Sequence, residues 1–236
     1  MVSRISVCMA VKNGESFILE QLASILPQLA GEDELIISDD HSSDNTLKII
    51  QGVDDPRIRL IQNDRFGLIA NFENALGAAS GTYIFLADQD DVWMPDKIAS
   101  TLHHLKNYDL VVTDCMIVNE NLELTQESFY DQNHSRKGLV HNLFKNSYMG
   151  CCMAFHKKVL AKVLPFPERI PMHDSWIGLI AEIHFRVKFV DQKLLYHRRH
   201  QHNASTTSNR SNASLADKLT ERYWLLKNVI ALSHAT

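Results

Sequence analysis

Short apolar runs alternate with amphipathic segments along the chain, and each run has the length and composition of a buried strand. Where the spacing of apolar residues changes from a continuous run to every third or fourth position, it predicts a helix. In the first half, this pattern predicts strands at 5–11, 34–38, 58–61, 83–87 and 109–114, and helices at 16–29, from about 46, at 71–80 and at 97–106. Such alternation of strands and helices is typical of a parallel sheet with right-handed crossovers.

The second half has a less regular pattern. Residues 119–138 are polar with little periodicity and are predicted to form a loop. Further on, the pattern predicts strands at 149–155, 186–189 and 193–196, and helices at 139–144, 156–164 and 176–183. Residues 201–214, rich in Asn, Ser and Thr, have the composition of a mobile loop. The last predicted helix begins near Leu215 and carries an apolar stripe at Leu215, Leu219, Tyr223, Leu226 and Ile230, which fits a dimer face, a membrane-surface face or core equally well.

Polar side chains follow three of the predicted strands at the point where each strand ends. They are Asn13 and Glu15 after the first strand, Asp39 and Asp40 after the second, and Asp88, Asp90 and Asp91 after the fourth. Because parallel strands bring their carboxyl ends to one edge of a sheet, we expect these groups to converge on one crevice.

The three carboxylates within Asp88–Asp91 repel one another, and a divalent cation would relieve that repulsion. Mg²⁺ and Mn²⁺ prefer oxygen ligands and bridge carboxylates to substrate phosphates. The alternative is a solvated acidic turn in which Asp90 or Asp91 caps the next helix, and for this motif alone the turn is favoured. The sequence contains no Gly-rich phosphate loop of the usual dinucleotide or P-loop kind. A nucleotide would therefore bind through the carboxylates, with the metal holding its phosphates.

Composition narrows the class of protein. The chain has 236 residues, 45% hydrophobic and 22% charged, as is ordinary for a globular protein. Its net charge of −4 gives no support to nucleic-acid binding, and we find no apolar stretch of the length of a membrane-spanning helix. The four cysteines lack zinc spacing and are predicted to be reduced core residues. We expect a cytoplasmic location, with the inner face of the membrane as the alternative.

Several segments together resemble the family 2 glycosyltransferases. They are residues 7–15, the strand end Ile36-Ile37-Ser38-Asp39-Asp40 with the turn after it, and residues 81–91; the DQDDVW form, His173-Asp174-Ser175-Trp176 and residues 196–200 resemble the bacterial rhamnosyltransferase-like branch. The resemblance covers about residues 4–205. It implies the GT-A fold, an α/β Rossmann-like domain whose mostly parallel central sheet is flanked by helices and joined by a smaller acceptor-side sheet. It also implies a nucleotide-sugar donor, a divalent metal and inversion at the anomeric carbon.

The resemblance also implies a role for each matching residue. Asp174 matches the catalytic base, Asp90 and Asp91 match the metal-binding positions, and Arg199 and His200 fall where the family closes over the diphosphate. The residues that it assigns to the nucleotide are Ala10, Val11, Asn13, Glu15, Asp39, Asp40, Asp88 and Asp90. Asn71 is a further candidate for a nucleotide contact, and the alternative, in which it only orders a turn, is slightly favoured. Without the resemblance, Asp174 would be interpreted as the N-cap of the helix that follows it.

The expected organisation is a glycosyltransferase domain at 1–214 and a C-terminal helix at 215–236. Within the domain, residues 1–114 form the nucleotide-sugar half and 115–214 the acceptor half. The expected partners are a dTDP- or UDP-sugar, with dTDP-L-rhamnose first, and a saccharide acceptor that is free or lipid-linked, with peripheral membrane contact as a further expectation. The cofactor is Mg²⁺ or Mn²⁺. The rival functions are a GT-A-like nucleotidyltransferase and a non-catalytic sugar-binding domain.

Overall fold

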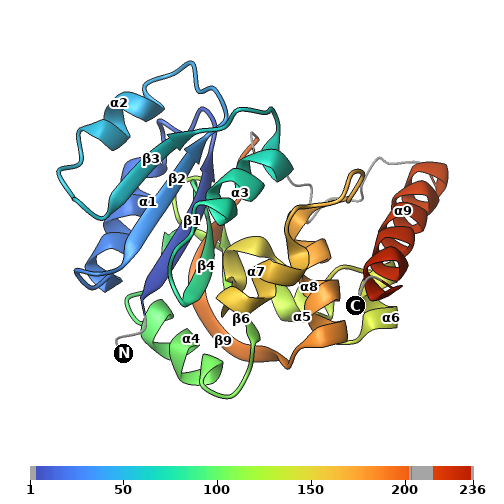
Figure 1. Ribbon diagram of the computed structural model, residues 1–236. Coiled ribbons are helices and arrows are strands. Elements are labelled where there is room, and N and C mark those ends of the chain that lie inside the picture. The colour runs from blue at the N-terminus through green and yellow to red at the C-terminus, as the bar shows by residue number, and fades with distance from the viewer. Residues whose placement is uncertain (1–3, 202, 204–214, 235–236) are drawn as a thin grey trace.

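The computed structural model describes residues 4–201, 203 and 215–234 (Figure 1). The strands are β1 (Ile5–Val11), β2 (Glu34–Asp39), β3 (Ile58–Gln62), β4 (Tyr83–Asp88), β5 (Val92–Trp93), β6 (Leu110–Val118), β7 (Leu124–Gln126), β8 (Met153–His156) and β9 (Val187–Arg198). The helices are α1 (Ile18–Ile25), α2 (Thr46–Gln51), α3 (Leu68–Gly77), α4 (Lys97–Leu105), α5 (Phe129–Asn133), α6 (Leu139–Phe144), α7 (Lys157–Val163), α8 (His173–His184) and α9 (Leu215–His234), with 3₁₀ turns η1 (Leu26–Gln28) and η2 (Gly150–Cys152).

One nine-stranded sheet runs through the molecule in the order β3-β2-β1-β4-β8-β6-β9-β5, and β7 pairs with β6. The part from β3 to β4 is parallel, as the alternating pattern predicts. Beyond β4 the sheet is mixed, because β8 lies antiparallel to both β4 and β6. The strands expected to form a smaller acceptor-side sheet therefore continue the central sheet.

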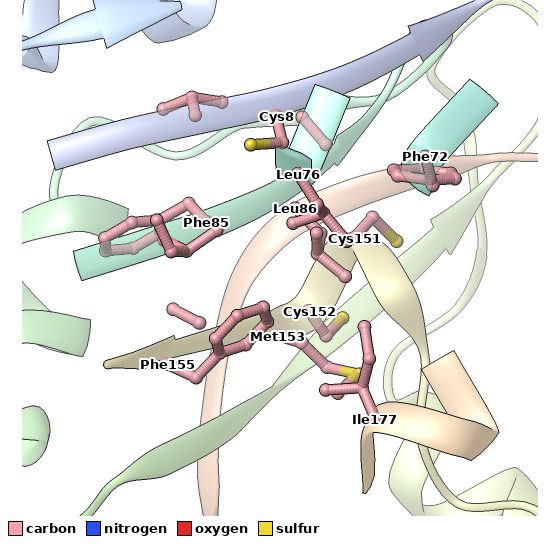
Figure 2. Packing of buried hydrophobic residues seen from close by; sticks show 14 of the residues in the cluster. Cys8, Phe72, Leu76, Phe85, Leu86, Cys151, Cys152, Met153, Phe155 and Ile177 are labelled. Carbon is pink, nitrogen blue, oxygen red and sulfur yellow. The ribbon is translucent and has the colours of Figure 1, made fainter. Parts of the chain in front are cut away.

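The core lies between this sheet and the helices that cover it. All seven residues of β1 are buried, in keeping with their continuous apolar run. Figure 2 shows Phe72 and Leu76 of α3 packed near Leu86 and Cys151, with Phe85 and Phe155 further along the core. All four cysteines are buried and unbridged, so the prediction of reduced core thiols is confirmed.

The sequence pattern does not predict three short elements. Strands β5 and β7 are only two and three residues long, and α5 occupies part of the predicted loop at 119–138. The Oγ of Ser128 caps α5 by accepting from Asp131 N–H, and Ser128 donates to the buried carboxylate of Asp114. The two strands predicted at 186–189 and 193–196 are one continuous strand, β9, whose register against β6 shifts on either side of Asp114.

The C-terminal helix lies at the edge of the molecule, beside α6 and α8 and far from β3 (Figure 1). Among its described side chains, those of Leu225 and Val229 are buried. By contrast Leu219, Tyr223 and Leu226, which belong to the predicted apolar stripe, are exposed. The stripe therefore does not pack as core. Among the described helices, none is both long enough and apolar enough to cross a membrane.

Candidate active site

A cavity of about 960 Å³ opens at the carboxyl ends of β1, β2 and β4, where the polar strand ends were expected to converge. Its far wall is formed by α6, η2, the start of α8 and Leu225 of α9. Predicted site residues that line it are Ala10, Val11, Asp40, Asn71, Asp88, Asp90 and Asp174. The cavity thus brings the strand-end carboxylates and the expected base to one space.

Asp40, at the end of β2, is buried and held by three donors. Lys12 Nζ lies 2.9 Å from its Oδ2, Asn63 Nδ2 donates to Oδ1 at 3.1 Å, and the backbone N–H of Gly67 donates to both oxygens. Although burial acts in the opposite direction, these donors lower the pKa of Asp40. The carboxylate is therefore ionised at neutral pH and faces the cavity as a fixed acceptor.

Three other predicted nucleotide residues shape the loops behind this wall. Asn13, at φ +50°, accepts the backbone N–H of Ser43, and Glu15 accepts from both nitrogens of Asn45. Asp39 accepts the backbone N–H of Ser42 and the amide of Gln62. Their side chains tie the first strand end to the second, and they stand outside the set of described residues that lines the cavity.

His41 occupies the turn after β2, next to Asp40. It has φ +60°, in the left-handed region that favours glycine. Its ring stacks on Phe66 with centroids 4.5 Å apart, a contact that glycine lacks. The turn geometry is thus kept with a different residue.

Asn71 belongs to α3 and reaches the end of β1, where its Nδ2 donates to the carbonyl of Val11 at 3.1 Å. Its Oδ1 is buried without a hydrogen-bond partner among the described residues. An unmatched buried acceptor is costly, so a donor group of a ligand in the cavity would stabilise this side chain.

The acidic segment 88–91 at the end of β4 is held in place by residues that the sequence analysis did not predict as part of the site. Gln89 Oε1 accepts the backbone N–H of Lys12 and its Nε2 donates to the Lys12 carbonyl, which joins the end of β4 to the end of β1. A Cβ on Gly14 would lie 2.5 Å from Gln89 Oε1, so only glycine leaves room for this amide. Burial and the charges of Asp91 and Asp90 raise the pKa of Asp88 well above its usual range.

Asp90, which lines the cavity, contacts the largely buried side chain of His200. Asp90 Oδ2 lies 2.8 Å from His200 Nε2 and accepts from Asn203 Nδ2 at 2.9 Å. The ring of His200 is tilted on Phe17, with centroids 4.7 Å apart. A carboxylate oxygen and an imidazole nitrogen are thus within coordinating distance of one point.

Asp91, the other predicted metal residue, is fully buried behind Asp88. Its Oδ1 lies 2.9 Å from His197 Nδ1 and accepts the backbone N–H of Arg198. Burial alone would lower the pKa of His197, but Asp91 and then Asp88 and Asp90 outweigh it and raise this pKa to about 9. Asp91 is therefore one half of a buried ion pair that holds β9 against the acidic segment.

The two arginines after His197 differ in their surroundings. Arg198 is buried: its Nε donates to the Asp90 carbonyl, its Nη2 pairs with Glu20, and its guanidinium lies 4.8 Å from the centroid of Phe17. Arg199 is half-buried, and burial lowers its pKa despite the nearby charges of Asp90 and Asp91. Arg198 thus holds the acidic segment in place, and Arg199 is the cation that follows Arg198 in the chain.

Asp174 lies in the first turn of α8, whose N-cap is Met172, so the alternative in which Asp174 is the N-cap is wrong. Its oxygens accept backbone N–H groups from Ser175 and Gly150, at 2.5 and 3.2 Å, and the amide of Asn146. Burial outweighs these bonds and raises the pKa of Asp174 to about 7. The burial that a catalytic base at a helix start requires is therefore present.

The donor atoms in the cavity fit a divalent cation. Asp90 Oδ2 and His200 Nε2 lie 2.8 Å apart, and oxygen with imidazole nitrogen suits Mn²⁺. In a second group, ligand atoms of Asp88, Asp91, Cys151 and His197 lie within 4.8 Å of one another. In that group, Asp91 and His197 already pair with each other.

Comparison with known proteins identifies the class. Residues 6–164 match the model of the family described as glycosyl transferase family 2, which is more than half of the chain; the chain belongs to that family. It is similar to the WfgD protein of Escherichia coli, described as a UDP-Glc:α-D-GlcNAc-diphosphoundecaprenol β-1,3-glucosyltransferase, with 29% identity over 69% of this chain and 64% of the relative. The chain thus spans less than two thirds of that relative's length.

A second relative covers more of the chain. The dTDP-rhamnosyl transferase RfbG of Shigella flexneri is 26% identical over 96% of this chain and 84% of its own length. Among solved structures, Staphylococcus aureus TarS 1–349 in complex with UDP-GlcNAc has a TM-score of 0.73 at 17% identity, covering 97% of this chain and 66% of that chain. The mannosyltransferase PcManGT from Pyrobaculum calidifontis, in complex with GDP-Man and Mn²⁺, has a TM-score of 0.66 at 18% identity, covering 99% and 74%. These structures establish the fold, and the expected GT-A class is confirmed.

Proposed function

We propose that this chain transfers a single sugar from a nucleoside-diphosphate sugar to a saccharide or lipid-linked saccharide acceptor, with inversion at the anomeric carbon. The setting is the synthesis of a bacterial surface polysaccharide such as O-antigen or capsule. The observation that carries the proposal is the meeting of Asp174, with its pKa raised to about 7, and the carboxylates of Asp88 and Asp90 in one cavity.

Asp40 is the proposed acceptor for an N–H group of the base. It is ionised, oriented by Lys12 and Asn63, and faces the cavity beside Val11 and Asn71. Ala10 contributes to the same wall. Asn13, Glu15 and Asp39 support this end of the site by ordering its loops. The nucleotide would therefore lie over the ends of β1 and β2.

The diphosphate end of the donor is assigned to the part of the cavity that Asp90 and Asn203 line, where Asp90 and His200 would hold Mg²⁺ or Mn²⁺. When bound, that ion supplies Lewis-acid neutralisation of the leaving diphosphate. Arg199 adds a positive charge next to His200 in the chain. Asp91 supports the metal residue indirectly, because its pair with His197 fixes the segment that carries Asp90.

Asp174 is the proposed general base. It accepts the proton of the acceptor hydroxyl, so that the oxygen attacks the anomeric carbon from the face opposite the diphosphate. A positioned base contributes about 10²–10⁴-fold to the rate, most when its pKa lies near the working pH. The same burial that raises the pKa of Asp174 makes the carboxylate a stronger base than a surface aspartate.

The proposed donors are dTDP-L-rhamnose first and UDP-hexoses or UDP-N-acetylhexosamines second. Both kinds of donor are supported, since one relative is described as a dTDP-rhamnosyl transferase and another as acting with UDP-Glc. The test is to incubate the chain with Mn²⁺ and each nucleotide sugar and to measure the release of free dTDP or UDP.

Release of a nucleoside diphosphate from one donor supports the proposal. Release of pyrophosphate from a nucleoside triphosphate and a sugar phosphate would instead identify a nucleotidyltransferase. Tight binding of a nucleotide sugar with no turnover, with or without saccharide acceptors, would identify a binding domain.

A further inference from the structure

Six large apolar side chains among the described residues lie exposed over two neighbouring helices. They are Val140 and Phe144 of α6 and Leu219, Tyr223, Leu226 and Ile230 of α9, with exposed fractions from 43% to 70%. We call this set the α6–α9 face. The two helices lie side by side at the edge of the molecule (Figure 1), and Arg222 joins them, because its Nη2 donates to the Phe144 carbonyl and its guanidinium lies 5.4 Å from the centroid of that ring.

The α6–α9 face is not the side on which α9 packs against the rest of the protein, so its exposed apolar side chains need another explanation. Leu225 and Val229 face the protein and are 3% and 6% exposed. Leu219, Tyr223 and Leu226 share a second stripe, since positions three and four apart fall on one side of a helix. Contiguous apolar surface of this kind marks contact with a partner or a membrane.

Basic side chains border the apolar stripe. At about 100° per residue, Arg222 and Lys227 fall on opposite sides of it, and Lys227 is exposed. Lys145 is exposed directly after α6. The segment from 132 to 147, which contains α6, carries Arg136, Lys137 and Lys145 but neither Asp nor Glu, whereas α9 carries acidic as well as basic residues. Arg222, Lys227 and Lys145 therefore place positive charge beside the apolar stripe.

The face is continuous with the wall of the cavity. Phe144, Lys145, Arg222 and Leu225 all line the cavity, on the side away from Asp40. An apolar surface thus leads from solvent at α9 to the space next to Asp174.

We infer that the α6–α9 face rests on the surface of a bilayer that contains anionic lipid. An apolar stripe flanked by basic residues is the pattern of a helix that lies in the membrane interface, and the basic flanks would attract anionic headgroups. A second copy of the chain fits less well, because a two-fold contact would bring the basic residues of both copies into one interface. Resting on the proposed function, the orientation presents the cavity to a lipid-linked acceptor at the point where its sugar leaves the membrane.

The test is sedimentation of the chain with vesicles in the absence of nucleotide. Wild-type chain should sediment with vesicles of phosphatidylcholine mixed with phosphatidylglycerol, less with phosphatidylcholine alone, and less with the mixed vesicles at high salt, which screens the basic residues. The double variant Leu219→Glu/Leu226→Glu should lose about tenfold or more in vesicle affinity, because burying each leucine drives insertion. The matched control Leu19→Glu/Leu124→Glu changes two leucines of similar exposure on α1 and β7 and should stay within about twofold.

Circular dichroism checks that each variant is folded. The variant Lys227→Glu keeps the apolar stripe and measures the contribution of charge by itself. It should bind mixed vesicles several-fold more weakly than the wild-type chain. Failure of the wild-type chain to bind mixed vesicles, or equal binding by both double variants, overturns the inference. So does light scattering that shows a dimer dissociated by Leu219→Glu/Leu226→Glu without vesicle binding. Turnover of nucleotide sugars with a soluble acceptor is measured separately, so a failure of the proposed function would be seen apart from a failure at the membrane.

Discussion

At the scale of single residues, the carboxylates of the site differ in pKa because their surroundings differ. Donors lower the pKa of Asp40, whereas burial raises that of Asp174 to about 7. Burial, together with the charges of Asp91 and Asp90, raises the pKa of Asp88 as well. One cavity therefore combines a permanent anion, a base and a group that a cation would stabilise in its charged form.

The pH dependence of transfer should report Asp174. A base must be ionised to accept a proton, so kcat/KM should rise with pH through an apparent pKa near 7 and level off above it. Donor affinity measured over the same range serves as the control, because Asp40 stays ionised throughout it. A flat kcat/KM profile from the normal pKa range of an aspartate to above neutrality would show that another group limits the rate.

Asp91→Asn should destabilise the fold by about 3–5 kcal/mol near pH 6, since it leaves a buried imidazolium without its partner. The pKa of His197 is raised to about 9, so the pair stabilises the folded state fully below the unfolded-state pKa of about 6.5 and loses this contribution as pH rises through about 9. Denaturant unfolding should show the difference from wild type shrinking between these values. Equal stability of the two chains near pH 6 would contradict a structural role for the pair.

At the scale of elements, α8 must approach closely enough to set Asp174 over η2. Gly178 of α8 permits that approach, because a Cβ there would lie 2.3 Å from atoms of the Tyr148 ring. The ring is anchored by its hydroxyl, which donates to Glu182 at 2.6 Å, and it lines the cavity. The position of the base is thus coupled to the packing of one helix on one aromatic ring.

Gly178→Ala should therefore lower the free energy of unfolding by about 1–3 kcal/mol, because the added methyl group overpacks the contact with Tyr148. It should also lower kcat, because Tyr148 and α8 would move apart. Gly77→Ala in α3 is the matched control, since nothing lies within 4 Å of its Cβ position and alanine favours the helix by up to about 1 kcal/mol. Denaturant unfolding and kcat are measured for both. Equal stability of the two variants would show that the contact with Tyr148 yields without cost.

The local sequence pattern predicts the strands that are buried along a whole apolar run and the helices that bury one whole face. It succeeds for β1, β2 and β4, and their polar ends converge as expected because parallel strands share an edge. It fails for β5 and α5, which are short and depend on distant partners such as Asp114 for Ser128. The chain also offers two apolar stripes on α9, and periodicity alone does not decide which one packs.

Within the site, sequence and resemblance predict which residues meet, but not what each touches. Asp40, Asp88, Asp90 and Asp174 do share one cavity. The pairing of Asp91 with His197 joins residues 106 positions apart, and the Gln89 bridge joins two loops; neither has a local signal. Roles for Asp91, Arg199 and His200 stay predictions.

At the scale of the whole molecule, the sheet is shared by both halves of the chain. β8 from the second half lies between β4 and β6, so the halves 1–114 and 115–214 fold around one core, and the boundaries at 114 and 214 stay predictions. The loop predicted at 201–214 lies outside the described residues except for Gln201 and Asn203. The two halves of the chain thus share one continuous sheet.

Donor binding should stabilise this whole unit. At one hundred times Kd, a nucleotide with Mn²⁺ should add about 2.7 kcal/mol to the free energy of unfolding. Asp90→Ala should keep the fold but lose the Mn²⁺-dependent part of this gain, because its carboxylate is proposed to hold the ion beside His200. Thermal unfolding with nucleotide, with and without EDTA, measures the effect; the same Mn²⁺-dependent gain in Asp90→Ala would place the metal elsewhere.

The central claim, that the half-buried Asp174 at the start of α8 is the base of a sugar transfer, is tested most directly by Asp174→Asn. Asparagine keeps the size and accepts hydrogen bonds from Ser175 and Gly150, but it takes no proton. The measurement is single-turnover sugar transfer together with donor affinity, for variant and wild type, at a pH above 7. We predict unchanged donor affinity and transfer slower by about 10²-fold or more. Transfer within a few-fold of wild type would contradict the account and place the base on another residue.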